Sequence, residues 1–483
     1  MTERPAKLPT ELWRWDALDL AEAIRARTIS SREAVAACLT RLAAVNGTVN
    51  AVVNIQADQA LAAADNADAA TKRDGTLPPL HGVPVLLKDL VDQAGIATVD
   101  GVAAFKTRIA TEDSPVVANW RRAGAIILGR TNTPPFSARW DTSNAVHGRT
   151  WNPWTRARTP GGSSGGAGAA LATGIAPLAH GTDLGGSIRY PAYCCGVSGI
   201  RPTMGRVPQF NSTMAVERTL WAQMIAVHGA LARRVRDLRV GLAAMSAGDP
   251  RDPFWVPAPL VGPPPARPIK VALVTDSPGL FVHAAVRSAV RKAGAALADA
   301  GYLVEEVQPP SISAAAQLWA SLGATDTRLL GLDTIRKLGD AESYTVNRLF
   351  IETVPPIATM ADYLRALAEV MTHRRAWGVF LESYPLIVGP NSGDLPFEIG
   401  FDIKDIPLTQ HQLSAQALMT AVNLLGLPSV AVPVGSAEVA DAPRGLPLGV
   451  QVIAGRYRED LALEAAEAIE ARHPSATPID PVT

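Results

Sequence analysis

The sequence predicts an α/β fold, which we interpret as a single large α/β/α sandwich around a twisted mixed sheet. The apolar run 82–88 indicates a buried strand, SPVVANWRRA at 114–123 a helix, and AIILG at 125–129 a second strand. A strand–helix–strand unit recurs further on, as KVALV, residues 284–300 and YLVEEV. Such alternation favours helices packed on the faces of a sheet. The 47% hydrophobic content of the 483-residue chain suffices for a large core.

The first part of the chain predicts three helices, near 16–27, 31–46 and 56–72. The second has the clearest start, because Ser30 and Ser31 precede Glu33, a pattern typical of a capping box. Its apolar residues recur at helical spacing, at positions 35, 38, 39, 42 and 45.

The second half predicts a helix at 235–245, a proline-rich connector at 249–268 and a largely helical stretch at 311–385. A helix at 411–425, strands VAVPV and LGVQVI, and a helix at 459–471 close the chain. We interpret residues 1–483 as one domain. Its core covers 80–245 and 405–470, and a variable helical region for substrate specificity covers about 305–400.

Charge and composition exclude several classes of function. Lys plus Arg equals Asp plus Glu at 45 each, so no basic excess indicates nucleic-acid binding. No run reaches the roughly 18 apolar residues of a membrane span, and the N-terminus lacks the apolar core of a signal peptide. We therefore expect a cytoplasmic protein, monomer or homodimer, that acts on a small molecule.

The cysteines and histidines indicate neither a disulfide framework nor a metal site. Cys194 and Cys195 are adjacent, which suits a disulfide badly, and Cys38 is the only other cysteine. The eight histidines are scattered, with none at i, i+4 and no Cys-x-x-Cys pair. We expect no metal and no organic cofactor.

Residues 159–191 hold two glycine-framed serines, Ser163 and Ser187. Glycine lets backbone N–H groups approach a ligand closely, and a serine among such groups can attack a carbonyl. A nucleophilic serine also needs a base. His180 lies in an apolar run, and Lys88, between Leu87 and Leu90, is the better base because apolar burial favours the neutral amine.

Three motifs together resemble the amidase signature family: Lys88 in GVPVLLKD, Ser163 in GGSSGG and Ser187 in GTDLGGSIRYP, at spacings of 75 and 24 residues. The resemblance implies a Ser-cisSer-Lys triad in which Ser187 is the nucleophile, Ser163 shuttles the proton and Lys88 is the base. The peptide bond before Ser163 would be cis. The backbone N–H groups of Leu184, Gly185, Gly186 and Ser187 would form the oxyanion hole of an amide hydrolase.

The resemblance also places Phe136, Ser137, Ala138 and Trp140 beside the acyl pocket. These side chains are small or aromatic, and Arg139 is expected to point away or to cap the rim. A neutral apolar pocket favours neutral acyl groups over a charged glutamine. We therefore expect hydrolysis of neutral aryl or alkyl amides, with esters and aryl carbamates (urethanes) as further substrates.

Four alternatives compete with this hypothesis. GGSSG fits the Gly-x-Ser-x-Gly elbow of α/β-hydrolases, but WNPWTRARTP before it is not strand-like. A phosphate-binding loop would need a following Gly-Lys-Ser/Thr. A non-catalytic scaffold of the same fold would be expected to lack one triad residue. The glutamine-deamidating A subunit of a tRNA-dependent amidotransferase stays open, although QFNSTMAVERTLWAQ departs from its usual serine-rich pattern.

Overall fold

The computed structural model describes residues 9–73 and 75–483. In this part of the chain eleven strands form one sheet. In spatial order they are β1 (Val52–Ile55), β3 (Ile126–Thr131), β2 (Pro84–Lys88), β6 (Leu178–Asp183), β8 (Val227–Ala232), β7 (Ser198–Arg201), β12 (Ser429–Val439), β13 (Ala442–Ala454), β11 (Leu386–Pro390), β9 (Lys270–Leu273) and β10 (Leu303–Glu305). A separate hairpin pairs β4 (Ser143–Asn144) with β5 (Gly148–Arg149).

The sheet is mixed, as predicted. β2 runs parallel to both of its neighbours, β3 and β6, and β9 runs parallel to β10 and β11. The remaining pairs are antiparallel, including β6 with β8 and β12 with β13. Parallel strands need long crossover connections, and helices supply these here.

Helices cover both faces of the sheet, which confirms the α/β class. Strand β2 shows this directly, because Val85 and Leu87 pack into one hydrophobic cluster and Leu86 packs into another. The helices are α1 (Ala17–Arg25), α2 (Ser31–Val49), α3 (Ala57–Thr71), α4 (Pro115–Arg122), α5 (Gly165–Ala172), α6 (Arg189–Cys195), α7 (Leu220–Ile225), α8 (Val235–Met245), α9 (Ala284–Asp299), α10 (Ile312–Asp326), α11 (Leu332–Leu338), α12 (Ala341–Thr353), α13 (Met360–Ser383), α14 (Ile406–Ala415), α15 (Ala417–Leu425) and α16 (Glu459–Arg472).

The start of α2 has the predicted capping box. The Ser30 hydroxyl accepts from the Glu33 N–H at 3.1 Å, and the Glu33 carboxylate accepts from the Ser30 N–H at 2.7 Å. The helix ends at Asn50, whose left-handed backbone stops it three residues beyond the predicted end.

Two strands lie in segments for which the sequence predicted no element, and one predicted helix is divided. The apolar stretch 167–180 contains most of α5 and the start of strand β6, and VHGALA at 227–232 forms β8. Short, fully buried runs lack the alternation that marks a strand. The predicted helix at 411–425 is two helices, α14 and α15, which meet at Gln416 although no Gly or Pro marks the break.

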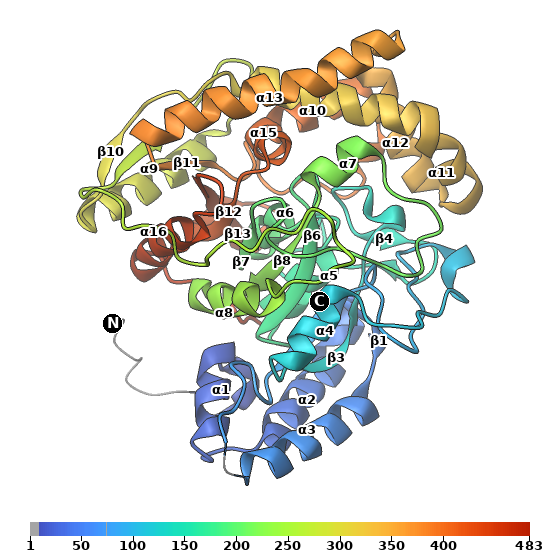
Figure 1. The fold of residues 1–483 in the computed structure, drawn as a ribbon, viewed down its shortest axis with the longest axis vertical. Helices are drawn as coiled ribbons and strands as arrows, with labels where there is room; N and C mark the ends of the chain where they lie inside the picture. The colour runs from blue at the N-terminus through green and yellow to red at the C-terminus, as the bar shows by residue number, and fades with distance from the viewer. Residues whose placement is uncertain (1–8, 74) are drawn as a thin grey trace.

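The region 311–385 is helical, as predicted, and includes α10 to α13. Figure 1 shows these helices gathered at one end of the molecule, with α1, α2 and α3 at the opposite end. Among the described residues, no helix combines the length and apolar character needed to cross a bilayer.

Candidate active site

Lys88 is the last residue of strand β2 and is completely buried. The apolar residues before it fill both faces of the sheet, so the strand carries the amine into the interior. Its Nζ donates to Ser163 Oγ at 2.6 Å and to Thr182 Oγ1, on the neighbouring strand β6, at 3.0 Å. The structure therefore brings together two of the three predicted triad residues in a direct hydrogen bond.

Burial, assisted by the charge of Arg218, lowers the pKa of Lys88 to about 7, although Asp100 and Asp183 act in the opposite direction. A substantial fraction of this amine is therefore neutral near pH 7, unlike an ordinary lysine. Asp89, next in the chain, does not neutralise it, because the Asp89 carboxylate binds the Arg130 guanidinium at 2.7 Å.

Ser163 precedes helix α5 and is almost fully buried. The Gly162–Ser163 peptide bond is cis, as the family resemblance implies. Gly161 has a φ of +79°, and a Cβ there would lie 2.7 Å from the Pro191 Cα, so only glycine fits at this position. Neighbouring Ser164 has a different environment, since its N–H donates to the Ser187 carbonyl at 3.2 Å.

Ser187 lies in the turn between β6 and α6 and is 8% exposed, compared with 0% for Lys88 and 1% for Ser163. Its hydroxyl makes no hydrogen bond with any described residue, Ser163 included. Of the three predicted catalytic residues, Ser187 is thus the one most open to a ligand.

The Asp183 carboxylate holds this turn in place through several hydrogen bonds. Its partners are the N–H groups of Gly186 at 2.9 Å and Ile188 at 3.2 Å, the Arg189 guanidinium at 3.0 Å and the Asn423 amide at 2.7 Å. Although burial alone would raise the pKa of Asp183, Arg189 and Arg201 hold it well below its usual value. The Asp183–Arg189 pair is thus a structural ion pair, which holds the turn in place.

The four predicted oxyanion donors are not equivalent. Gly186 N–H already donates to Asp183, whereas the N–H groups of Leu184, Gly185 and Ser187 have no acceptor among the described residues. Three of the four predicted donors therefore stay available to a ligand oxygen.

In the predicted acyl-pocket segment, Phe136 and Ser137 both adopt positive φ. The Ser137 hydroxyl donates to Asp100 at 2.7 Å, while the Ala138 side chain is exposed. Trp140 is half-buried, and its indole N–H donates to the Gly185 carbonyl at 2.8 Å.

Arg139, expected from the sequence either to point away from the pocket or to cap its rim, is buried in a set of ion pairs. Its guanidinium is buried against Asp402, at 2.6 and 2.9 Å, and also binds Glu342 of α12 at 2.5 Å. The ion pairs tie the 135–141 segment to the helical region.

Sequence reasoning missed several residues of this site. Thr182 could have been found, because it lies within the GTDLGGS motif and faces the same way as His180 on β6. Asp100, Arg218 and Trp319 had no such signal, since each comes from a segment without a recognisable motif. Trp319 lies on α10 and donates its indole N–H to the Leu184 carbonyl at 3.0 Å.

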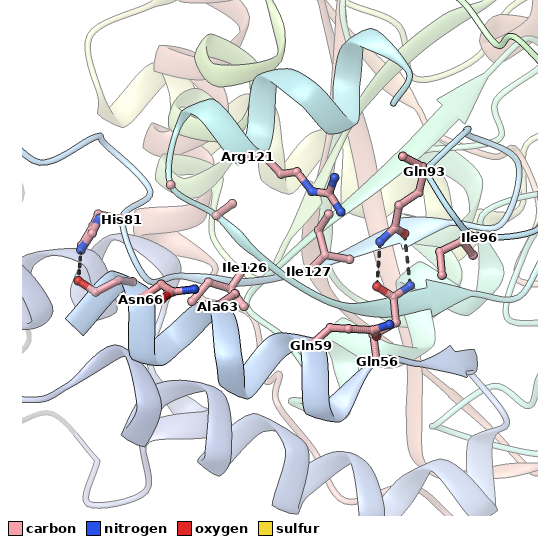
Figure 2. Close-up of a pocket in the computed structure, with 14 residues that line it drawn as sticks. Gln56, Gln59, Ala63, Asn66, His81, Gln93, Ile96, Arg121, Ile126 and Ile127 are labelled. Carbon is pink, nitrogen blue, oxygen red and sulfur yellow. Dashed lines mark hydrogen bonds between the residues drawn. The ribbon is translucent and has the colours of Figure 1, made fainter. Parts of the chain in front are cut away.

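A separate pocket of about 580 Å³ opens beside α3 and β3. Figure 2 shows its amide-rich lining, in which the side chains of Gln56 and Gln93 exchange hydrogen bonds of 2.7 and 3.1 Å. None of the predicted catalytic residues lines it, so this pocket is distinct from the site around Lys88.

Comparison with known proteins identifies the class of protein to which this fold and site belong. Residues 33–463 match the Amidase family, so the chain belongs to that family. Among solved structures, 6-aminohexanoate cyclic dimer hydrolase in complex with substrate superposes with a TM-score of 0.81 at 28% identity, covering 96% of this chain and 98% of the other. A bacterial aryl acylamidase of the amidase signature family gives 0.79 at 25% identity, covering 96% of each chain.

More specific relatives appear in sequence comparison. An indoleacetamide hydrolase of Bradyrhizobium diazoefficiens is 43% identical over 462 residues, covering 95% of this chain and 87% of that protein. The A subunit of the glutamyl-tRNA(Gln) amidotransferase of Moorella thermoacetica is 32% identical over 486 residues, covering 95% and 97%. The chain is an amide hydrolase of the amidase signature type, and its greater similarity to the hydrolase does not favour the amidotransferase alternative.

Proposed function

We propose that this protein hydrolyses neutral aryl-substituted amides, of the class represented by indoleacetamide, through Ser187, Ser163 and Lys88. The observation that carries the mechanism is the 2.6 Å contact between Lys88 Nζ and Ser163 Oγ inside a fully buried environment. A buried amine with a substantial neutral fraction near pH 7 can accept a proton that an ordinary lysine could not.

The first half-reaction transfers the acyl group to the enzyme. Ser187 Oγ attacks the amide carbonyl carbon as its proton passes to Ser163 Oγ, while the Ser163 proton passes to Lys88 Nζ. The N–H groups of Leu184, Gly185 and Ser187 stabilise the negative oxygen of the tetrahedral intermediate. When the C–N bond breaks, the proton returns through Ser163 to the leaving nitrogen, which departs as ammonia or an amine.

In the second half-reaction, water attacks the Ser187 ester and gives up its proton along the same route. The Ser187–acyl bond breaks, the carboxylic acid leaves and the serine regains its proton. No step needs a metal or an organic cofactor. Esters and aryl carbamates present the same carbonyl to Ser187, so we include them as further substrates.

The substrate class is supported by the relatives and by the surroundings of the turn. The 43% identical relative is an indoleacetamide hydrolase, and a solved structure of the same fold is an aryl acylamidase. Trp140 and Trp319 lie beside the turn with their rings stacked at 6.2 Å between centroids. Such aromatic surroundings suit an apolar aryl group better than the charged α-ammonium and α-carboxylate groups of free glutamine.

The triad is tested by substitution. Ser187→Ala and Lys88→Met are expected to remove nearly all turnover, and Ser163→Ala to leave a small remainder, because water can replace a shuttle. Ser164→Ala is the matched control and should stay within about tenfold of wild type, since it leaves the shuttle path intact. Near-wild-type turnover by Ser187→Ala would disprove the nucleophile. A sulfonyl fluoride should label Ser187, as read by mass spectrometry.

The substrate class is tested by comparing kcat/KM for indole-3-acetamide, an acyl anilide, a phenyl carbamate and L-glutamine. The aryl amides should be preferred over glutamine by at least about a hundredfold, the scale expected when a charged group must enter an apolar site unpaired. A preference for glutamine would contradict the proposal and restore the amidotransferase alternative.

A further inference from the structure

Two indole N–H groups hold the turn that carries Ser187. Trp319 of α10 donates to the Leu184 carbonyl at 3.0 Å, and Trp140 donates to the Gly185 carbonyl at 2.8 Å. These tryptophans come from segments far apart in the chain and meet at consecutive peptide groups of one turn.

We propose that Trp140 and Trp319 are positioning residues that fix the two peptides on either side of Gly185 and so aim the Gly185 N–H at the substrate oxygen. The proposal rests on the proposed function, because it assigns these indoles a part in stabilising the oxyanion. It assigns the polar edge of each indole to the enzyme backbone rather than to the substrate.

The geometry of the peptide group carries this inference. In a planar trans peptide the carbonyl and the following N–H point in opposite directions. Fixing the Leu184 carbonyl therefore fixes the Gly185 N–H, one of the three available donors. Fixing the Gly185 carbonyl likewise directs the Gly186 N–H, which donates to Asp183 at 2.9 Å.

The flanking peptides of the turn are held in the same way. The Asp183 carbonyl accepts from Arg201 at 2.8 Å, and the Gly186 carbonyl accepts from the Tyr190 N–H at 2.7 Å. The carbonyls of residues 183–186 are thus all occupied from outside the turn. Without the indoles, the Leu184–Gly185 peptide would lose its only hydrogen bond to the described residues, and the Gly185–Gly186 peptide would be held from one side alone, through the Gly186 N–H and Asp183.

Close packing makes the indoles rigid. The Trp140 and Trp319 rings are stacked at an interplanar angle of 22°, and Trp319 also packs against Trp221 at 5.9 Å and Phe350 at 6.1 Å between centroids. A Cβ on Gly185 would lie 2.7 Å from Trp319 Cζ2, so the ring lies directly against the backbone. An indole has a single donor and no acceptor, and here that donor is committed to the turn.

The position of Trp319 also links substrate selection to catalysis. It lies on α10, in the helical region expected to determine specificity, and its ring contacts α7 through Trp221 and α12 through Phe350. A displacement of α10 would reach the oxyanion donors through the hydrogen bond from Trp319 to the Leu184 carbonyl.

The test compares Trp319→Phe and Trp140→Phe with Trp221→Phe as the matched control. Trp221 is buried in the same aromatic cluster, but its indole N–H has no hydrogen-bond partner among the described residues. All three variants remove one indole N–H from the cluster, and only two of them release a carbonyl of the turn.

We expect kcat on an aryl amide to fall about 10- to 100-fold in Trp319→Phe and Trp140→Phe, somewhat less than deletion of an oxyanion donor. KM should stay within about threefold, and Trp221→Phe should stay within about twofold in kcat. Affinity for an aryl trifluoromethyl ketone, which forms a tetrahedral adduct, should weaken in parallel with kcat/KM, while affinity for the product acid should not.

Several outcomes would overturn the proposal: an unchanged kcat, a change confined to KM, or an equal loss in Trp221→Phe. If a phenylalanine variant fails to fold, benzothienylalanine at position 319 keeps the bicyclic shape while removing the donor, and the same fall in kcat is required of it. Failure of the proposed function would look different, since wild type would then lack aryl amidase activity or Ser187→Ala would retain it.

Discussion

A lysine amine at the buried end of a strand loses the hydration that favours its charged form. At Lys88 this loss outweighs the nearby carboxylates, so the pKa falls to about 7 although Asp100 and Asp183 both oppose the fall. The free-energy cost of burying this amine is offset by the pairing of β2 with its neighbours β3 and β6 in the sheet. The site thus derives its basicity at neutral pH from the fold rather than from a histidine.

The pH dependence of activity follows from this pKa. Because the neutral amine is the active form, kcat/KM should rise about tenfold per pH unit below pH 7 and level off above it, measured from about pH 5.5 to about 9.5. Asp100→Asn removes a charge that raises the pKa of Lys88, so its profile should have a lower midpoint. A flat profile, or one that falls with pH, would contradict the role of Lys88 as the base.

The same shift predicts that Lys88 destabilises the fold. The pKa is about 7 in the folded protein and about 10.4 in an unfolded chain, so the cost is fully present below pH 7 and disappears toward pH 10. At about 1.4 kcal/mol per pKa unit this cost is roughly 5 kcal/mol, partly offset by the hydrogen bonds to Ser163 and Thr182.

Lys88→Met should therefore unfold at higher urea concentration than wild type near neutral pH, by about 1–3 kcal/mol, with a smaller gain at about pH 9.5. Ser163→Ala keeps the lysine and serves as the control, so its stability relative to wild type should lack this trend. An equal gain for Lys88→Met at both pH values would show that lost charge burial is not the cause.

At the scale of secondary structure, local patterns predicted the elements that carry strong signals of their own. The capping box of α2 and the buried strand β2 are both determined by short stretches of sequence. Strands β6 and β8 were missed because their short apolar runs fit a helix as well as a strand. Their pairing depends on partners distant in the sequence, which no local window contains.

The residues of the site likewise fall into two groups, those that local sequence features mark and those that depend on packing between distant segments. Lys88, Ser163 and Ser187 could be selected because glycine framing and apolar flanks are local features of the sequence. Trp319 could not, because its contact with Leu184 depends on how α10 packs, and nothing near position 319 marks a polar role. The catalytic role of the three selected residues stays a prediction until the variants are measured.

Helix packing predicts opposite effects for one substitution at two glycines. Gly378, inside α13, is exposed, and a Cβ there would meet nothing within 4 Å. Gly166, in the first turn of α5, would place a Cβ 2.5 Å from the Asn132 backbone nitrogen. Gly378→Ala should therefore stabilise the protein by about 0.5–1 kcal/mol through helix propensity.

Gly166→Ala gains the same propensity but forces α5 away from its neighbour, so we expect a loss of at least about 2 kcal/mol. Activity should fall as well, because α5 begins two residues after Ser163. Urea unfolding curves and kcat/KM measure both effects. Equal stability changes in the two variants would show that propensity rather than packing dominates in α5.

For the molecule as a whole, one sheet of eleven strands joins the described parts of the chain. The variable helical region is attached to this sheet, because β11, directly after α13, pairs with β13 and β9. The interpretation of the chain as one domain stays a prediction. It predicts that the whole chain unfolds in one cooperative transition.

The three cysteines offer a test of that cooperativity. All are fully buried: Cys38 and Cys195 lie in one hydrophobic cluster and Cys194 in another. Burial raises the pKa of Cys38 to about 12 and also raises the pKa of Cys194 and Cys195, so the reactive thiolate is scarce. The native protein should react with fewer than about one thiol reagent per chain, and activity should survive the treatment.

In increasing urea, all three thiols should become reactive over the same concentration range if the chain unfolds as one unit. Mass spectrometry of tryptic peptides separates Cys38, on α2, from the Cys194–Cys195 pair at the end of α6. Labelling of Cys38 at urea concentrations that still protect the pair would show that the N-terminal helices unfold independently, contrary to a single domain. Because α6 follows directly from the turn that carries Ser187, activity should be lost in the same urea range in which the Cys194–Cys195 pair becomes reactive.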